Sequence, residues 1–257
     1  MLETKIVQKF GNSGHIVLPK EYIGRRIKFT TETKTFSQIK SEIISILEPY
    51  LEHILGVYLY GSYARNEQTL ESDIDILVIT DKKIKIQKEN YEIISVTLKE
   101  IESTLESNAM LVLPIIKDAK PIINNTLLET LNNKQFEIKK SIKWFKESTV
   151  ESIKSAKELI ELDKLEGEYI SSYSIIYSLI LRLRGTYLIK CLSSGKKFFN
   201  KDFKKWLLKK ISDEDFNNMY KTYQKVRDKK KVKGIKIKIK SAICLLDFLK
   251  EEIEKIE

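Results

Sequence analysis

Two short motifs carry the residues of this chain that could do chemistry. The first is Gly61-Ser62, which directly follows the apolar run Val57–Tyr60 and is therefore predicted to lie at the end of a strand. The second is the pair Asp73 and Asp75, which begins a second apolar run after a gap of ten residues. Residues two apart on a strand point to the same face, so this spacing predicts two neighbouring carboxylates.

Neighbouring carboxylates repel each other unless a cation lies between them. Mg²⁺ suits such a pair, because it usually takes one or two protein carboxylates and completes its coordination with substrate phosphates. The turn before the pair provides for a phosphate, since Gly61 allows close approach to the backbone and Ser62 can donate its hydroxyl and N–H. The residues predict a cation-dependent phosphate site. The alternative is a surface turn followed by a strand with two solvated aspartates.

This combination resembles the DNA polymerase β-like nucleotidyltransferase superfamily, whose mark is Gly-Ser followed at a similar distance by Asp-x-Asp. The likeness is closer to its minimal members, and rests on Gly-Ser-Tyr-Ala-Arg at 61–65 and Ser-Asp-Ile-Asp-Ile-Leu-Val at 72–78. The resemblance implies an α/β core with a small mixed sheet. It also implies transfer of a nucleoside monophosphate from a nucleoside triphosphate such as ATP to an acceptor hydroxyl, with Asp73 and Asp75 holding two Mg²⁺ ions, or Mn²⁺ in their place.

The resemblance extends to the residues around the two motifs. Gly61 and Ser62 would hold the β- and γ-phosphates, and Ser72 would belong to the same nucleotide-binding group. Arg65 would either add a phosphate contact or form an ion pair on the helix surface, and the sequence leaves both roles open.

The superfamily usually supplies a third acidic ligand from a strand beside the Asp-x-Asp strand. Glu92 is the carboxylate inside the β-branched run 91–98, so it is the candidate for this third metal ligand and catalytic residue. In that role it would help to lower the pKa of the attacking hydroxyl. The alternative is a solvated charge at the start of a strand.

The first thirty residues show a different pattern. Two alternating apolar runs within 5–20 flank the turn-rich segment Gly11–Gly14, which predicts a β-hairpin, followed by a turn and another strand within 19–29. Gly-Asn-Ser, Leu-Pro-Lys-Glu and Ile-Gly-Arg-Arg resemble the archaeal type of AbrB/SpoVT-like swapped-hairpin domains, which interlock as dimers and in many cases bind DNA. For this short segment we expect a homodimer, or packing against the next domain, ahead of DNA binding.

Apolar periodicity predicts the remaining elements and three domains. The expected domains are a hairpin segment (1–30), a nucleotidyltransferase core (31–125) and a C-terminal α-helical bundle (126–257). We expect a helix over 36–55 with Thr35 or Ser37 as N-cap. The other elements expected are strands at 73–79 and 91–98, helices at 99–107 and 110–116, an extended piece at 119–124, and helices at 126–162, 167–194, 199–210, 213–230 and 234–256.

Charge is unevenly distributed over the 257 residues. The chain carries a net charge of +10, and residues 196–240 hold 17 Lys and Arg against five Asp and Glu. Such a cluster favours phosphate contacts with nucleic acid, whereas a lysine-rich solvated surface is the alternative. The acceptor could therefore be RNA such as a tRNA end, a protein hydroxyl as in antitoxins that modify a partner toxin, or a small molecule.

A non-enzymatic function is the competing interpretation. In it the chain would be a nucleotide-sensing or DNA-binding dimer, for instance an antitoxin-like regulator. No apolar run approaches the roughly 18 residues of a membrane helix, and the start is no signal peptide, so we expect a cytoplasmic protein that does not bind membranes. Cys191 and Cys244, the two cysteines, are expected to be buried thiols.

Overall fold

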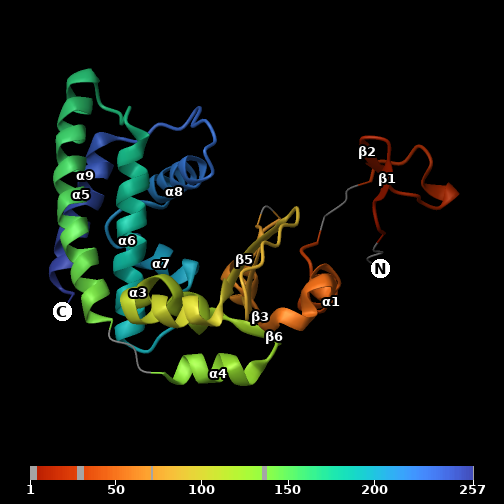
Figure 1. Cartoon of the computed structure of the whole chain (residues 1–257). Coiled ribbons are helices and arrows are strands. Elements are labelled where there is room, and N and C mark those ends of the chain that lie inside the picture. Colours follow the sequence, from red (N-terminus) through yellow and green to blue (C-terminus); the bar gives the residue numbers. More distant parts are fainter. Residues whose placement is uncertain (1–4, 28–31, 71, 135–137, 257) are drawn as a thin grey trace. The chain divides into compact units, whose positions relative to one another are not determined.

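The computed structural model describes residues 5–27, 32–70, 72–134 and 138–256. The chain divides into two compact units, Met1–Thr33 and Lys34–Glu257. Figure 1 shows the elements of both units, and each unit is described by itself.

The first unit contains the predicted hairpin. Strands β1 (Gln8–Phe10) and β2 (Ser13–His15) pair antiparallel around Gly11, whose φ of +56° suits glycine. A short 3₁₀ helix, η1 (Lys20–Tyr22), follows. The strand predicted within 19–29 is absent as far as Ile27, and the rest of that segment lies outside the described residues.

Apolar side chains of this unit are exposed to a degree that is unusual for a hairpin. Ile6 is 86% exposed, Ile23 78% and Phe10 69%. A two-stranded hairpin has too little surface to bury both of its faces, and an isolated one is at best marginally stable in water. These side chains therefore gain from a partner surface.

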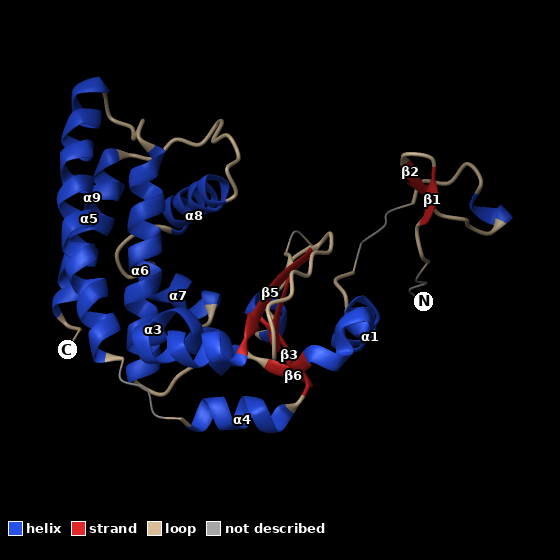
Figure 2. Ribbon diagram, viewed as in Figure 1, coloured by secondary structure: helices blue, strands red, loops and turns tan. Residues whose placement is uncertain are grey.

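A four-stranded mixed sheet forms the centre of the second unit, as predicted (Figure 2). Its strand order is β5-β4-β3-β6, with β4 parallel to β5 and β3 antiparallel to both of its neighbours. The strands are β3 (Ile54–Tyr60), β4 (Ile74–Thr80), β5 (Tyr91–Thr97) and β6 (Lys120–Ile123).

Helix α1 (Phe36–Leu47) covers one face of this sheet. It begins at a capping box in which Thr35 and Gln38 each bind the other's backbone N–H, and it buries Ile39 and Ile43 in a cluster with Val57. The helix ends eight residues before the predicted end at 55. Pro49 cannot donate a helical hydrogen bond, and the chain instead forms a 3₁₀ turn, η2 (Glu48–His53), and enters β3.

The opposite face is covered by α3 (Leu98–Asp118), whose Ile101 and Leu105 cluster with Tyr58 and Leu77. Alternate residues of β3 and β4 therefore serve the two clusters, as the period of a strand requires. The two helices predicted at 99–107 and 110–116 are one kinked element, which departs from helical geometry at Asn108 (φ −149°, ψ 69°).

Helices make up the rest of the chain. The single helix predicted over 126–162 is wrong, because α4 ends at Asn133 and a separate α5 begins at Lys139. The other four predicted helices are present, with ends that differ by a few residues. The helices are α4 (Asn125–Asn133), α5 (Lys139–Glu166), α6 (Tyr173–Ser193), α7 (Asn200–Leu207), α8 (Asp213–Arg227) and α9 (Ile239–Glu254).

Helix α6 runs through the centre of this helical part, packed against α5, α8 and α9 (Figure 1). It is apolar on nearly all sides, with Ile176, Ile180 and Leu183 fully buried. At its start the Asp163 carboxylate accepts hydrogen bonds from the backbone and hydroxyl groups of Ser171 and Ser172. The domain boundary at 125/126 stays a prediction, since α4 packs its Leu128 and Leu131 into the α3 cluster of the sheet.

Two further expectations concern the thiols and the membrane. Cys191 is buried and Cys244 half-buried, and both are free thiols. In the ranges that the structure describes, no helix combines the length and apolar character needed to cross a bilayer.

The exposed hairpin generates a prediction about assembly. The intact chain should be a dimer in light scattering, and a chain lacking residues 1–33 should be a monomer, because the hairpin of a second copy would cover Phe10 and Ile6. Phe10→Lys should also give a monomer, whereas Lys9→Gln on the same strand should leave the dimer intact. A monomeric intact chain, or a dimer that survives the deletion, would contradict this.

Candidate active site

The three predicted carboxylates lie at one end of β4 and β5. The parallel register of these strands places Asp75 directly opposite Glu92, and Asp73 stands two residues before Asp75. Asp75 continues the row of Leu77 and Ile79, which belong to the α3 cluster. Asp73 and Glu92 are exposed and Asp75 is half-buried, so the carboxylates lie on the α3 face of the sheet where solvent reaches it.

Gly61 brings the turn after β3 against this carboxylate group. Tyr60 pairs with Asp75 across β3 and β4, and Gly61 then leaves the strand with φ +71°. A Cβ atom at position 61 would lie 1.9 Å from Asp75 Oδ2, which no real side chain could occupy. Position 61 therefore needs glycine both for its backbone conformation and for the space.

Helix α2 (Gly61–Ala64) begins at this turn and aims a backbone donor at the site. The backbone N–H of Ser62 favours the ionised form of the Asp75 carboxyl and so lowers its pKa. The Gly-Ser turn thus lies directly against the Asp-x-Asp strand, and a shared role of the two motifs in one site stays a prediction.

The charges of the site act on Asp75. Burial raises the pKa of its carboxyl to about 7, and the negative charges of Glu92 and Asp73 act in the same direction. The Arg65 guanidinium and the Ser62 N–H oppose this increase in the pKa only in part. Burial and the charges of Asp75 and Glu92 also raise the pKa of the Tyr60 hydroxyl. The site therefore carries negative charge for which the described residues supply too little compensation.

A divalent cation would supply the missing compensation, and the donor set fits Mg²⁺. All three candidates offer hard carboxylate oxygens, the ligand type that Mg²⁺ prefers. In the described part of the chain, no three acidic, histidine or cysteine side chains already meet around one point. Two carboxylates are enough for Mg²⁺ when a bound triphosphate and water provide the other oxygens.

An open pocket adjoins Glu92. It has a volume of about 450 Å³ and is lined by residues 86–89 and 91–93, which join β4 to β5 and begin β5. Glu92 therefore faces space that a substrate could enter.

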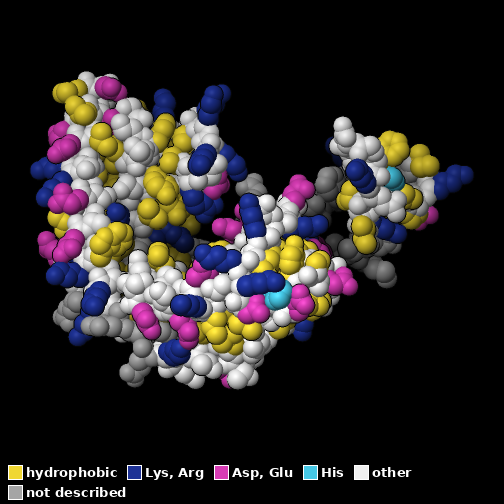
Figure 3. Space-filling view, viewed as in Figure 1, with side chains coloured by type: hydrophobic (Ala, Val, Ile, Leu, Met, Phe, Trp, Pro, Cys, Tyr) yellow, Lys and Arg dark blue, Asp and Glu magenta, His cyan; other side chains and the backbone are white. Residues whose placement is uncertain are grey.

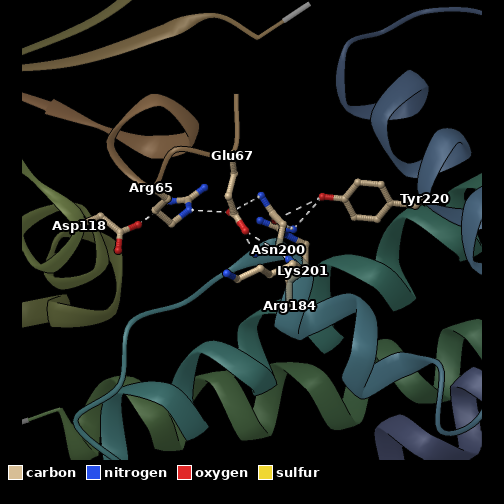
Figure 4. A network of polar contacts seen from close by, with 7 residues as sticks. All are labelled: Arg65, Glu67, Asp118, Arg184, Asn200, Lys201 and Tyr220. Carbon is tan, nitrogen blue, oxygen red and sulfur yellow. Dashed lines mark hydrogen bonds and ion pairs between the residues drawn. The ribbon is translucent and has the colours of Figure 1, made fainter. Parts of the chain in front are cut away.

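A polar network connects the Gly-Ser turn with the helical part (Figure 4). Arg65, which follows α2, forms ion pairs with Glu67 (Nε–Oε2 3.2 Å) and with Asp118 at the end of α3 (Nη1–Oδ2 2.5 Å). The Glu67 carboxylate accepts hydrogen bonds from the backbone N–H groups of Asn200 (3.0 Å) and Lys201 (3.2 Å), and so caps the N-terminus of α7.

Arg184 of α6 extends the network. Its Nη1 donates to Asn200 Oδ1 (2.8 Å) and to the Tyr220 hydroxyl of α8 (2.9 Å), as Figure 4 shows. The backbone N–H of Glu67 also donates to the Ser62 carbonyl at 2.9 Å. Ser62 is thereby connected through Glu67 to α7, and from Asn200 of α7 through Arg184 to α6 and α8.

Sequence reasoning missed Glu67, Asn200 and Arg184 as members of this network. The position of Glu67 close to the Gly-Ser motif could have drawn attention to it. Asn200 and Lys201, which donate to its carboxylate, lie more than 130 residues away in the sequence. No local pattern predicts a contact over that separation.

The structure shows which groups Arg65 and Ser72 contact near the site. Of the two roles left open for Arg65, the structure contains the ion pair, and the phosphate contact stays a prediction. The Ser72 hydroxyl accepts a hydrogen bond from the Thr69 N–H (2.9 Å) in the turn that leads to Asp73. Its part in nucleotide binding also stays a prediction.

Comparison with known families agrees with this site. The family described as "Polymerase beta, Nucleotidyltransferase" matches residues 41–142, a range that includes the Gly-Ser turn, the Asp-x-Asp strand and Glu92. The chain contains a polymerase β-like nucleotidyltransferase domain. A second family, the transposon-encoded proteins DUF2080, matches residues 4–30. The AbrB-like resemblance of that segment has no support beyond its sequence pattern.

Similar proteins include spectinomycin adenylyltransferases. A stretch of 50 residues is 48% identical to spectinomycin 9-adenylyltransferase of Campylobacter jejuni, and covers 19% of this chain and 19% of that enzyme. A spectinomycin adenyltransferase from Enterococcus faecalis, crystallised with ATP and spectinomycin, superposes with a TM-score of 0.47 and 16% identity over 86% of this chain and 100% of that chain.

A nucleotidyltransferase-like protein from Exiguobacterium sibiricum superposes with a TM-score of 0.37 and 12% identity, over 84% of this chain and 74% of that one. Both TM-scores are low, so neither superposition locates a ligand in this chain.

The raised pKa of Asp75 predicts how stability depends on pH. Without divalent cations, Asp75→Asn should raise the melting temperature at pH 8 and raise it much less at pH 5. The folded pKa of about 7 lies above the ordinary value of 3.8, so the penalty for ionising Asp75 develops as the pH rises between these values. Asp247→Asn, which removes an exposed ion pair within α9, should show no such trend. An Asp75→Asn variant less stable than wild type at pH 8 would contradict this.

The capping role of Glu67 predicts a large stability effect for a residue outside every motif. Glu67→Ala should lower the free energy of unfolding in urea by about 2 kcal/mol, because two backbone donors and the Arg65 guanidinium lose a buried acceptor. Glu102→Ala removes a half-exposed ion pair with Lys134 and should stay within about 0.5 kcal/mol. Equal effects of the two substitutions would show that the network does not stabilise the fold.

Proposed function

We propose that the chain is a Mg²⁺-dependent nucleotidyltransferase that moves AMP from ATP to a hydroxyl of a small-molecule acceptor. The observation that carries this is the position of Asp73, Asp75 and Glu92 at one end of β4 and β5, with Asp75 packed against Gly61. Burial and like charge raise the pKa of Asp75 there, as expected of a site that awaits a cation.

Each residue has a distinct part in the proposed reaction. Asp73 and Asp75 hold the cation, and the Gly61-Ser62 turn binds the β- and γ-phosphates through its N–H groups and the serine hydroxyl. Bound Mg²⁺ supplies positive charge to the triphosphate and helps to lower the pKa of the acceptor hydroxyl.

Glu92 stands where the acceptor can reach it. As the acceptor oxygen forms its bond to the α-phosphorus, its proton passes to the Glu92 carboxylate, the bond from the α-phosphorus to the bridging oxygen breaks, and pyrophosphate leaves with the bonding electrons. The open pocket beside Glu92 supports this placement of the acceptor.

The local similarity to spectinomycin 9-adenylyltransferase favours ATP as donor and a small polyhydroxylated acceptor, and spectinomycin is the first acceptor to test. The match spans about a fifth of that enzyme's length, so the assignment of donor and acceptor to this chain rests on the experiment below.

RNA is the second candidate acceptor, because of the basic residues at 196–240. Ion pairs with described carboxylates engage five of their 17 Lys and Arg side chains: Lys204, Lys205, Lys210, Arg227 and Lys230. The other cations are available to phosphates. A protein acceptor, as in toxin–antitoxin systems, has no comparable observation in its favour.

The test is transfer of label from α-³²P-ATP, with Mg²⁺ present, to spectinomycin or to total RNA. Asp73→Asn and Asp75→Asn should each lower transfer about a thousandfold, which corresponds to roughly 4 kcal/mol of transition-state stabilisation. Ser62→Ala should lower it less, because the backbone N–H groups remain. Glu92→Gln should abolish transfer and spare ATP binding.

Asp81→Asn is the matched control and should transfer at the wild-type rate. Label on RNA alone would select the second candidate. A wild-type chain that binds ATP but labels nothing, with Mg²⁺ or Mn²⁺, would favour a nucleotide sensor. Full activity in a chain with both Asp73→Asn and Asp75→Asn would show that the active site lies elsewhere.

A further inference from the structure

A second cavity lies between α3, α5 and α6. Its volume is about 530 Å³, within the usual range of small-molecule sites, and none of Asp73, Asp75 and Glu92 lines it. Arg65 and Asp118, whose ion pair belongs to the network of Figure 4, form part of its wall.

Most of the lining is apolar and unusually accessible. Leu111 of α3 is 63% exposed, Trp144 of α5 is 61% exposed and Leu181 of α6 is 41% exposed. Figure 3 shows hydrophobic side chains on the surface over α5 and α6. Apolar side chains that gather around a cavity mark a binding site more often than scattered ones do.

The charge of the lining is positive. Three arginines, Arg65, Arg182 and Arg184, face a single carboxylate, Asp118, which Arg65 already neutralises. In the described part of the chain neither Arg182 nor Arg184 forms an ion pair with a carboxylate. Arg184 is occupied by Asn200 and Tyr220, as described above.

Arg182 is the residue with donors to spare. Its Nη1 donates to the Ser148 hydroxyl (2.9 Å), and its guanidinium lies 5.6 Å from the ring centre of Phe145. A guanidinium carries five N–H donors, so most of those of Arg182 have no protein acceptor among the described residues. Burial lowers the pKa of this side chain, which agrees with its half-buried position.

A glycine of α6 allows the Phe145 ring to lie close to Arg182. A Cβ atom at Gly185 would lie 2.5 Å from the Phe145 ring, so glycine allows this ring to pack closely on α6. The ring, the Trp144 indole and the guanidinium thus form one surface with an apolar part and a cationic part.

We propose that this cavity binds a small monoanion with an apolar body, such as an aryl or alkyl carboxylate, and that Arg182 holds the anionic group. Binding there needs neither nucleotide nor Mg²⁺, so the proposal stands apart from the proposed transfer reaction. The apolar wall favours a ligand with an apolar body, and the Arg182 guanidinium favours a ligand with a negative charge. A ligand that has both features should therefore bind most tightly.

The test compares two probes with the same apolar body, 4-phenylbutyrate and the neutral 4-phenylbutan-1-ol, by titration calorimetry without ATP or Mg²⁺. The wild-type chain should bind the carboxylate about tenfold more tightly or better, as one charge-assisted hydrogen bond allows. Arg182→Gln should reduce the affinity for the carboxylate to that for the alcohol and leave the alcohol unaffected. Lys143→Gln, which removes an exposed charge of α5 beside the cavity, should change neither.

The fluorescence of Trp144 locates the binding. The carboxylate should shift the emission of the wild-type chain, and Trp144→Phe should remove that shift. Equal affinity for the two probes, no binding of either, or an unchanged preference in folded Arg182→Gln would overturn the proposal. The comparison of the two probes on the wild-type chain decides the question even if Arg182→Gln does not fold.

Discussion

The contact between the Gly61 backbone and the Asp75 carboxylate constrains the rest of this structure. It requires a residue without a side chain, in a left-handed conformation, at the point where β3 ends. It also requires β3 and β4 to pair in the register that sets Tyr60 against Asp75. A shift of one residue would turn Asp75 to the opposite face and bury it in the α1 cluster, so the packing of α1 and α3 maintains the register that the site needs.

The same contact holds the Asp75 carboxylate in a half-buried position next to other negative charges, which raises the pKa of Asp75. Asp75 is half-buried beside Glu92 and Asp73, and the positive charge of Arg65 opposes the resulting increase in the pKa of Asp75. Arg65 is itself shared with Glu67 and Asp118, so it cannot neutralise the site completely. The fold leaves this charge uncompensated where a cation and a triphosphate can reach it, which is how strain at a functional site usually arises.

Hydrogen bonds of Glu67 and Arg184 with Asn200 join the helical part to the loop that follows the Gly-Ser turn. Glu67 caps α7, and Arg184 connects that cap to α8, so the loop between the two motifs has little freedom of its own. A buried charged network of this kind is specific because every member needs its partner. Three of its members, Arg65, Asp118 and Arg184, also line the cavity between α3, α5 and α6.

The sequence by itself determined the local parts of this protein. The Gly-Ser turn, the Asp-x-Asp strand and the hairpin follow from residue types a few positions apart, because backbone conformation and side-chain period act over that range. The sequence left Thr35 and Ser37 open as the N-cap of α1, and the structure contains a capping box at Thr35. Glu92 could be chosen because it is the carboxylate within a β-branched strand, although only the pairing of β4 with β5 placed it opposite Asp75.

Tertiary structure alone decided what depends on distant residues. The early end of α1 is not among these features, because Pro49 is a local signal that the sequence itself contains. The capping of α7 by Glu67 joins residues 133 apart in the chain, and the arginine-lined cavity exists because α3, α5 and α6 converge. Contacts of this kind form through the folding of the whole domain, and a local sequence pattern contains no record of them.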